Sequence, residues 1–164
     1  MTYDGQEGIR EQNKKRYINR HNIWVDPYNA DGTVKPYNQR LAKPIVYHVN
    51  PDWPSAEEDP VLNETAQEVA DDWNRVFMNV ITELGARPPA GGRMYVLCPN
   101  NPVLEGDPAE CGEAGTRPRM GDIRYSFMAY VPDYMTYGLL GLGPSHTDPE
   151  TGEEKWVFDP DLDP

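Results

Sequence analysis

The stretch Gly121-Asp-Ile-Arg-Tyr-Ser-Phe-Met-Ala-Tyr-Val131 decides the fold that we expect for this chain. Apolar or aromatic residues alternate along it with other residues, from Ile123 through Phe127 to Val131. A period of two residues is typical of a β-strand that buries one of its faces. We therefore predict a strand here, within a larger sheet.

A second, glycine-rich strand is predicted at Gly138-Leu-Leu-Gly-Leu142, seven residues further on. Glycine in a strand lets another backbone approach closely, which the edge of a sheet needs when it pairs with a peptide. Leu139 and Leu140 fit an ordinary core equally well, so both interpretations stay open. Asp148-Pro-Glu-Thr-Gly-Glu153 then predicts a turn, because proline fixes its first corner and glycine supplies a positive φ at its end.

A long helix is predicted after a first strand at Ile45–Val49, which Pro44 opens. The helix starts either at a capping box, Ser55-x-x-Glu58, or at Asp59 followed by proline, and it ends before Gly85. Its apolar residues recur at steps of three and four and predict one wide stripe that packs on the sheet: Leu62, Ala66, Val69, Trp73, Val76, Phe77, Val80, Ile81 and Leu84.

With short strands at Arg93–Leu97 and Glu154–Phe158, the sequence predicts an α+β fold. The sheet is expected to be twisted and mixed, with about five strands and the long helix on one face. We expect an extended or partly disordered basic arm at residues 1–40, the α+β subdomain at 41–158 and an acidic tail at 159–164. Asn29–Gly32 predicts a turn, and Trp24 is the expected anchor of the segment around it.

The charge of the chain is unevenly distributed. Residues 1–43 contain eight Lys/Arg and five Asp/Glu, net +3, and residues 44–164 contain seven and twenty-two, net −15. A body this acidic argues against nucleic acid as a partner. No apolar run reaches the roughly 18–20 residues of a membrane span, and the first residues contain no apolar region of a signal peptide. If the protein is exported, this chain is an excised piece.

The order of the segments Gly121–Phe127, Gly138–Ser145 and Asp148–Glu153 resembles the strands that precede the active-site helix in metzincin-type zinc metalloproteases. The resemblance is to large secreted or lipoprotein enzymes of bacteria, and it covers roughly residues 37–158. Pro44–Pro51 and Glu68–Phe77 are similar to the first strand and the first helix of that group.

The resemblance implies that a substrate peptide pairs with the edge strand, through Gly138, Leu139, Leu140, Gly141, Leu142 and Gly143. It assigns no catalytic residue, because the H-E-x-x-H motif is absent and His21, His48 and His146 each stand alone in the sequence. The residues from Glu154 onward depart from the family pattern. Zinc is therefore expected only if a missing metal-binding segment exists, and the remainder of a larger protease is a possible partner.

The resemblance to exported proteins predicts a disulfide between Cys98 and Cys111 and an extracellular or cell-envelope location in a bacterium. Two free thiols in a cytosolic protein are the alternative. Asp148, Glu150 and Glu153 are weak candidates for calcium ligands, but no complete calcium-binding loop is present, so a solvated acidic segment is the simpler interpretation.

Two hypotheses for the function follow. In the first, the chain is the substrate-side scaffold of a zinc metalloprotease-like protein and is not catalytic on its own. In the second, it is a non-enzymatic interaction module with a protease-like fold, which docks a partner or propeptide by β-augmentation. A reading frame that continues into a helix with H-E-x-x-H favours the first.

Overall fold

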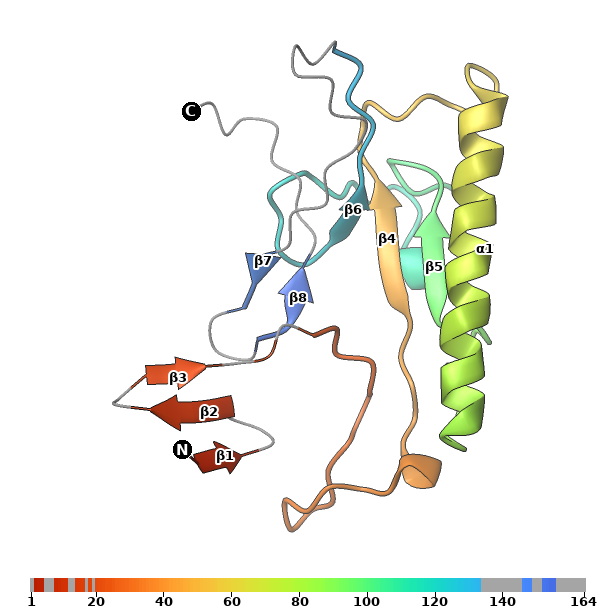
Figure 1. The fold of residues 1–164 in the computed structure, drawn as a ribbon. Helices are drawn as coiled ribbons and strands as arrows, with labels where there is room; N and C mark the ends of the chain where they lie inside the picture. Colours follow the sequence, from red (N-terminus) through yellow and green to blue (C-terminus); the bar gives the residue numbers. More distant parts are fainter. Residues whose placement is uncertain are drawn as a thin grey trace.

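The computed structural model describes residues 2–4, 8–11, 14–16, 18, 20–133, 146–148 and 152–155. Its main body is α+β: a long helix, α1 (Pro60–Glu83), lies along a sheet of β4 (Ile45–Val49), β5 (Tyr95–Cys98) and β6 (Ser126–Met128) (Figure 1). The strand order is β5-β4-β6, and both pairs are parallel. Parallel neighbours need a long crossover connection, and α1 is the crossover between β4 and β5.

The predicted sheet of five mixed strands is wrong for the described residues, where the main sheet has three parallel strands. The segment that begins at Glu154 forms β8 (Glu154–Lys155), which pairs antiparallel with β7 (His146–Thr147) in a separate two-stranded sheet. The predicted strand Gly138–Leu142 lies outside the described residues.

Within the predicted strand Gly121–Val131, the structure forms a strand only over the three residues of β6. Ile123, expected on the buried face, is 69% exposed. The chain turns here instead, since the Tyr125 amide donates to the Asp122 carbonyl at 3.0 Å and the Arg124 side chain bonds to the Asp122 carboxylate. Such local hydrogen bonds compete with a strand ladder, and sequence alternation does not reveal them.

The remaining strands are short. β1 (Thr2–Asp4), β2 (Gly8–Glu11) and β3 (Lys14–Arg16) form an antiparallel sheet. The predicted turn between β7 and β8 is confirmed at the described positions, because the Gly152 amide donates to the Asp148 carbonyl at 2.8 Å and Gly152 has a φ of 70°. Two 3₁₀ turns, η1 (Tyr37–Gln39) and η2 (Ala109–Cys111), complete the described elements.

The segment before β4 packs on the body through Trp24, the predicted anchor. Trp24 pairs with Ala42 in an isolated bridge and packs beside Ile81 of α1. The Arg40 guanidinium lies 5.3 Å from the centre of the Trp24 ring. The predicted turn at Asn29–Gly32 is also confirmed, because the Gly32 amide donates to the Asn29 carbonyl at 2.9 Å.

The start of α1 resolves the two alternatives left open by the sequence. Asp59 caps the helix, since its carboxylate accepts a hydrogen bond from the Leu62 amide at 2.9 Å, and Pro60 is the first helical residue. Ser55 and Glu58 form a separate turn in front of the helix, in which the Glu58 carboxylate accepts from the Ser55 amide at 2.8 Å.

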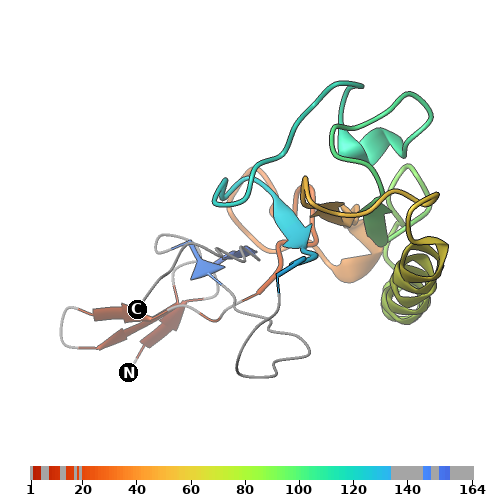
Figure 2. The same cartoon turned by 90° about the horizontal axis from the view of Figure 1, so that it is seen from above.

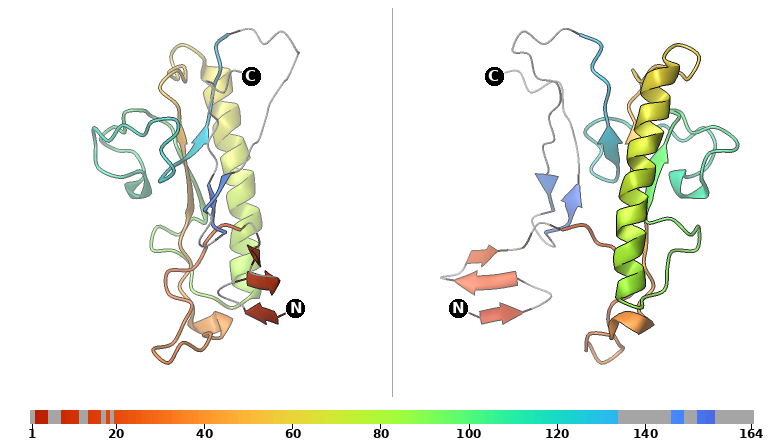
Figure 3. Two further views of the ribbon diagram at one scale, coloured as in Figure 1. Left: turned by 90° about the vertical axis from the view of Figure 1, so that its left-hand side faces the viewer. Right: turned by 45° about the vertical axis from the view of Figure 1, so that its right-hand side comes forward.

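The two faces of the sheet are covered by different parts of the chain. Ile45, Val49 and Leu97 pack with α1 on the helix face. Val96 and Cys98 pack on the opposite face, against the loop that follows β5. Figure 2 and the left view of Figure 3 show this arrangement, with α1 on one side of β4 and the loop on the other. A parallel sheet buried on both faces is the usual arrangement for such strands.

The side of α1 that is buried against the sheet is narrower than the sequence predicts. Ala66, Ala70 and Ile81 are buried, and the alanines let the helix approach the sheet closely. The expected apolar stripe is only partly covered, because four of its members are half exposed: Val69 (42%), Trp73 (50%), Val76 (49%) and Val80 (44%). Periodicity identifies the apolar side of a helix but not how much of that side the partner covers.

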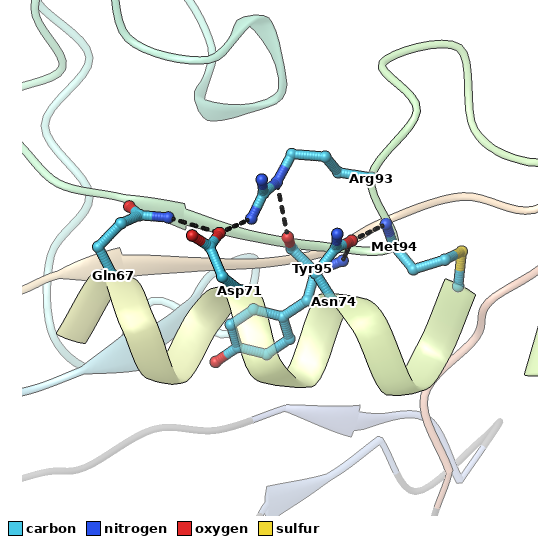
Figure 4. Close-up of polar contacts among 6 residues, drawn as sticks. All are labelled: Gln67, Asp71, Asn74, Arg93, Met94 and Tyr95. Atoms are coloured by element: carbon cyan, nitrogen blue, oxygen red, sulfur yellow. Dashed lines mark hydrogen bonds and ion pairs between the residues drawn. The ribbon is translucent and has the colours of Figure 1, made fainter. Parts of the chain in front are cut away.

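A side chain of α1 fixes the start of β5 (Figure 4). The Asn74 side-chain oxygen accepts hydrogen bonds from the amides of Met94, at 2.8 Å, and Tyr95, at 3.3 Å. Beside it, the Arg93 guanidinium bonds to the Asp71 carboxylate. That carboxylate also accepts a hydrogen bond from the Gln67 side-chain amide at 3.0 Å. Asn74 thus satisfies two backbone donors next to the buried strand.

We predict that Asn74→Ala lowers the free energy of unfolding by about 1–3 kcal/mol, because it leaves buried amides without an acceptor. Asn79→Ala, at an exposed site on the same helix, makes the same change in helix propensity and should alter stability by less than about 0.5 kcal/mol. Urea unfolding of both variants measures the difference. Equal effects would show that the Asn74 contacts do not stabilise β5.

Candidate functional site

The peptide-pairing residues expected from the sequence, Gly138, Leu139, Leu140, Gly141, Leu142 and Gly143, lie outside the described residues. The described structure shows what precedes them. β6 bonds to β4 on one side, and in the described part of the chain no strand pairs with its other side. β6 is therefore an edge of the described sheet, and it is the strand from which the chain continues towards the glycine-rich segment.

The exit of the chain from β6 is held by one side chain. The Asn50 side-chain nitrogen donates to the Tyr130 backbone carbonyl at 2.9 Å. In return, the Tyr130 backbone amide donates to the Asn50 side-chain oxygen at 2.9 Å. Asn50 directly follows β4 and is buried. This pair of bonds fastens Tyr130, two residues after β6, to the residue that follows the central strand.

The calcium candidates are only partly described. Asp148 and Glu153 lie on either side of the β7–β8 turn, where the Asp148 amide donates to the Glu153 carbonyl at 2.9 Å, and Glu150 lies outside the described residues. The Glu153 carboxylate lies 4.0 Å from the Lys43 ammonium. Among the described residues there is no group of three or more His, Cys, Asp or Glu side chains placed to hold a metal ion.

The predicted disulfide between Cys98 and Cys111 is present. It joins the end of β5 to η2 across thirteen positions of sequence and so ties the loop to the sheet. Closing a loop of about this length stabilises a protein by about 3 kcal/mol, chiefly through the unfolded chain. Both cysteines are buried in the core of the loop face with Val96 and Val103.

A pocket of about 360 Å³ opens on the loop face, between β4 and the disulfide-closed loop. Its lining combines apolar groups with several polar side chains: Val46, His48, Glu110, Cys111, Gly112, Thr116, Arg124 and Tyr125. The volume lies within the range of small-molecule sites. Sequence reasoning missed this pocket, because its walls come from β4, η2 and the turn before β6, and only the folded loop brings them together.

His48 is the buried polar residue of this pocket. The residue is 3% exposed, and its Nδ1 has no hydrogen-bond partner among the described residues. The Tyr125 ring lies edge-on to the imidazole, with 5.1 Å between the ring centres. Burial lowers the pKa of His48 below its ordinary value of 6.5, because a charged imidazole would lose its hydration there. His48 is therefore neutral near pH 7.

The helix face carries a row of aromatic side chains. Trp73 stacks on Phe77 with 5.6 Å between ring centres, Phe77 lies 6.4 Å from Tyr95, and Tyr95 lies 5.2 Å from Tyr47. Burial raises the pKa of Tyr95 to about 12. Burial also raises the pKa of Tyr47, with smaller contributions from Tyr95 and from the Glu154 carboxylate of β8. Both hydroxyls keep their protons at physiological pH.

Comparisons with known protein families, with curated proteins and with solved structures find no match. None of the helices in the described part of the chain combines the length and apolar character that a membrane crossing requires.

We predict that His48 makes stability depend on pH below about 6.5. The folded pKa is lowered, so the unfolded chain binds the proton more readily. The stability that neutral His48 contributes is complete above the unfolded pKa and is lost as the pH falls through the window below 6.5. Glu110, Arg124 and Tyr125 also line the pocket, so the comparison must isolate His48.

The variant His48→Gln provides that comparison, since it keeps a polar side chain that does not titrate. Urea unfolding at pH 7.5 and pH 5 should show the wild type losing stability relative to the variant at the lower pH. A constant difference between the two proteins, or a midpoint for His48 at or above 6.5 by NMR, would contradict the prediction.

Proposed function

We propose that this chain is the substrate-side scaffold of a zinc metalloprotease-like protein and is not catalytic on its own. Two described elements support the proposal. β4 occupies the segment that resembles the first strand of metzincin-type proteases, and α1 contains the segment that resembles their first helix. β4 and β5 are parallel neighbours, and α1 is the crossover helix that connects them, so the three elements form a strand–helix–strand unit.

The observation that carries the proposal is the position of β6. The order β5-β4-β6 places β6 at the edge of the described sheet, and Asn50 fixes the chain where it leaves that edge. The proposal assigns the peptide-pairing role to the next segment, Gly138–Gly143, whose glycines permit close approach of a second backbone. Main-chain hydrogen bonds would supply the affinity, and flanking side chains would supply the selectivity.

No catalytic role is assigned to these residues, because the H-E-x-x-H motif is absent from the sequence. A zinc site of this class needs three protein ligands and an activated water. In this proposal those ligands come from a segment outside the chain. The Cys98–Cys111 disulfide is consistent with a protein that works outside the cytoplasm.

A second candidate function, from another class, is an interaction module that has no catalytic counterpart and docks a partner or propeptide on the same edge. The β6 edge supports both candidates equally. A reading frame that continues into a helix with H-E-x-x-H favours the protease scaffold, and a natural protein without that helix favours the module.

Binding of an unfolded polypeptide tests the proposal. Fluorescein-labelled β-casein should bind this chain, as measured by fluorescence anisotropy, and should remain intact with or without added zinc. Leu140→Pro should weaken binding by about tenfold or more, because proline removes a main-chain donor from the pairing segment. Leu140→Ala is the matched control and should bind nearly as the wild type does.

Failure of β-casein to bind, or equal binding by the two Leu140 variants, would contradict the peptide-pairing role. Zinc-dependent cleavage of β-casein by this chain would contradict the claim that it is not catalytic on its own.

A further inference from the structure

The pocket on the loop face plays no part in the peptide-pairing role proposed above. It lies between β4 and the disulfide-closed loop, which is on the side of the sheet opposite α1 (Figure 2). Val46 and Cys111 give it an apolar wall, and its volume of about 360 Å³ is at the small end of the range of ligand sites. The pocket therefore suits a molecule about the size of a single ring with a short chain.

Glu110 provides an uncompensated negative charge at this pocket. The residue is half buried, and none of the ion pairs between described residues includes it. One of its carboxylate oxygens lies against Gly91, which has no side chain, so the carboxylate is confined between η2 and the turn before β5. A half-buried charge without a counter-ion is unfavourable, and a cationic ligand would relieve it by pairing with the carboxylate.

Arg124, the other charged residue that lines the pocket, is already neutralised. Its Nε donates to Asp122 Oδ1 at 2.9 Å, and a second guanidinium nitrogen donates to Asp122 Oδ2 at 2.6 Å. These hydrogen bonds hold the pKa of Asp122 at about 2, so both groups stay charged and compensate each other at physiological pH. Glu110 therefore sets the net charge of the pocket, and the acidic body of residues 44–164, with its net charge of −15, strengthens the attraction for a cation.

His48 adds a hydrogen-bond acceptor without adding charge. It is neutral near pH 7, and a neutral imidazole has one nitrogen that accepts a hydrogen bond. Its Nδ1 has no partner among the described residues, so the ring breaks no bond at this nitrogen when it turns toward a ligand. The Thr116 hydroxyl is a further acceptor in the lining. Glu110, His48 and Thr116 thus suit a ligand that is rich in donors.

A primary ammonium group matches these acceptors better than a metal ion does. It carries three N–H donors, as the lysine side chain does, and it bonds most strongly to a carboxylate. A structural metal ion of the zinc type needs about four ligands. The described residues contain no group of three or more His, Cys, Asp or Glu side chains placed to hold one. An organic cation also uses the apolar wall, which a metal ion would leave empty.

We propose that the loop-face pocket binds a small primary amine in its ammonium form, with the ammonium group paired to Glu110 and an apolar body packed against Val46 and Tyr125. His48 accepts a further hydrogen bond from the ligand. The site is separate from the β6 edge, and the proposal does not depend on the peptide-pairing role of Gly138–Gly143.

The probe is 2-phenylethylamine, because it joins one ring to one ammonium group. NMR titration of the His48 and Tyr125 ring signals at pH 7.5 should show saturable binding with a Kd of about 1 mM or below, as expected for a ligand this small. 2-Phenylethanol has the same ring and chain without the charge. It should bind at least about tenfold more weakly, because the charge-assisted hydrogen bond to Glu110 is lost. Phenylacetate, which is negatively charged, should shift neither signal.

Variants locate the contact. Glu110→Gln removes only the charge and should weaken binding of 2-phenylethylamine at least about fivefold. Glu105→Gln is the matched control, because Glu105 is an exposed glutamate of the same loop that does not line the pocket, and it should bind as the wild type does. Thr116→Met keeps every charge but fills the pocket, so it should weaken binding at least about tenfold. Far-UV circular dichroism shows that each variant is folded, and the two pocket variants are independent tests if one of them is not.

Several outcomes would overturn the proposal. They are the absence of saturable shifts with 2-phenylethylamine, equal binding of 2-phenylethylamine and 2-phenylethanol, and equal binding by Glu110→Gln and Glu105→Gln. Binding that Thr116→Met leaves unchanged would also overturn it, because the amine would then lie elsewhere on the acidic surface. Since β-casein binding should be unaffected by the Glu110 and Thr116 variants, failure at this pocket is distinguishable from failure at the β6 edge.

Discussion

The hydrogen bonding of β4 is the constraint on which the rest of the structure depends. This strand pairs with β5 on one side and with β6 on the other, so its backbone groups are satisfied without solvent. Ile45 and Val49 point into the helix-face core, and Val46 packs with the loop-face core. Both neighbours are parallel to β4, which requires long connections, and the chain uses them to build α1 on one face and the disulfide-closed loop on the other.

Each candidate site follows from that arrangement. The His48 pocket lies where the even positions of β4 meet the loop, because alternate strand residues point to opposite faces. β6 is an edge strand because, within the described structure, it pairs with β4 on one side and with no strand on the other. The loop face and the β6 edge are thus two separate surfaces of one small sheet.

The sequence predicted the elements whose signals are local. Pro44 and Pro51 bracket β4, Asp59 and Pro60 mark the start of α1, and the predicted bounds of β4 agree with the structure. The disulfide was predicted from a resemblance and from the loop between its cysteines, and it is present. The bounds of β4 and the start of α1 depend on neighbouring residues, which the sequence shows directly.

Features that depend on distant parts of the chain were not predictable. The alternation around Ile123 indicated a strand, but the bonds between Asp122 and Arg124 hold a turn there. Helical periodicity placed Trp73 and Val76 in the core, but both side chains are about half exposed, because the buried side of α1 is centred on Ala66, Ala70 and Ile81. His48 stands alone among the histidines of the sequence, and its pocket depends on where the loop after β5 folds back. The segment Gly138–Gly143 lies outside the described residues, so its role stays a prediction.

Amide hydrogen exchange tests the central claim most directly, because it reads the hydrogen bonding of β4 without any substitution. If β4 is the doubly paired centre of a parallel sheet, the amides of Val46–Val49 and of Val96–Cys98 should exchange most slowly in the chain, at the rate of global unfolding. Exchange in β4 as fast as in the loop around Gly115 would show that the strand is not held on both sides, and would contradict this account of the fold.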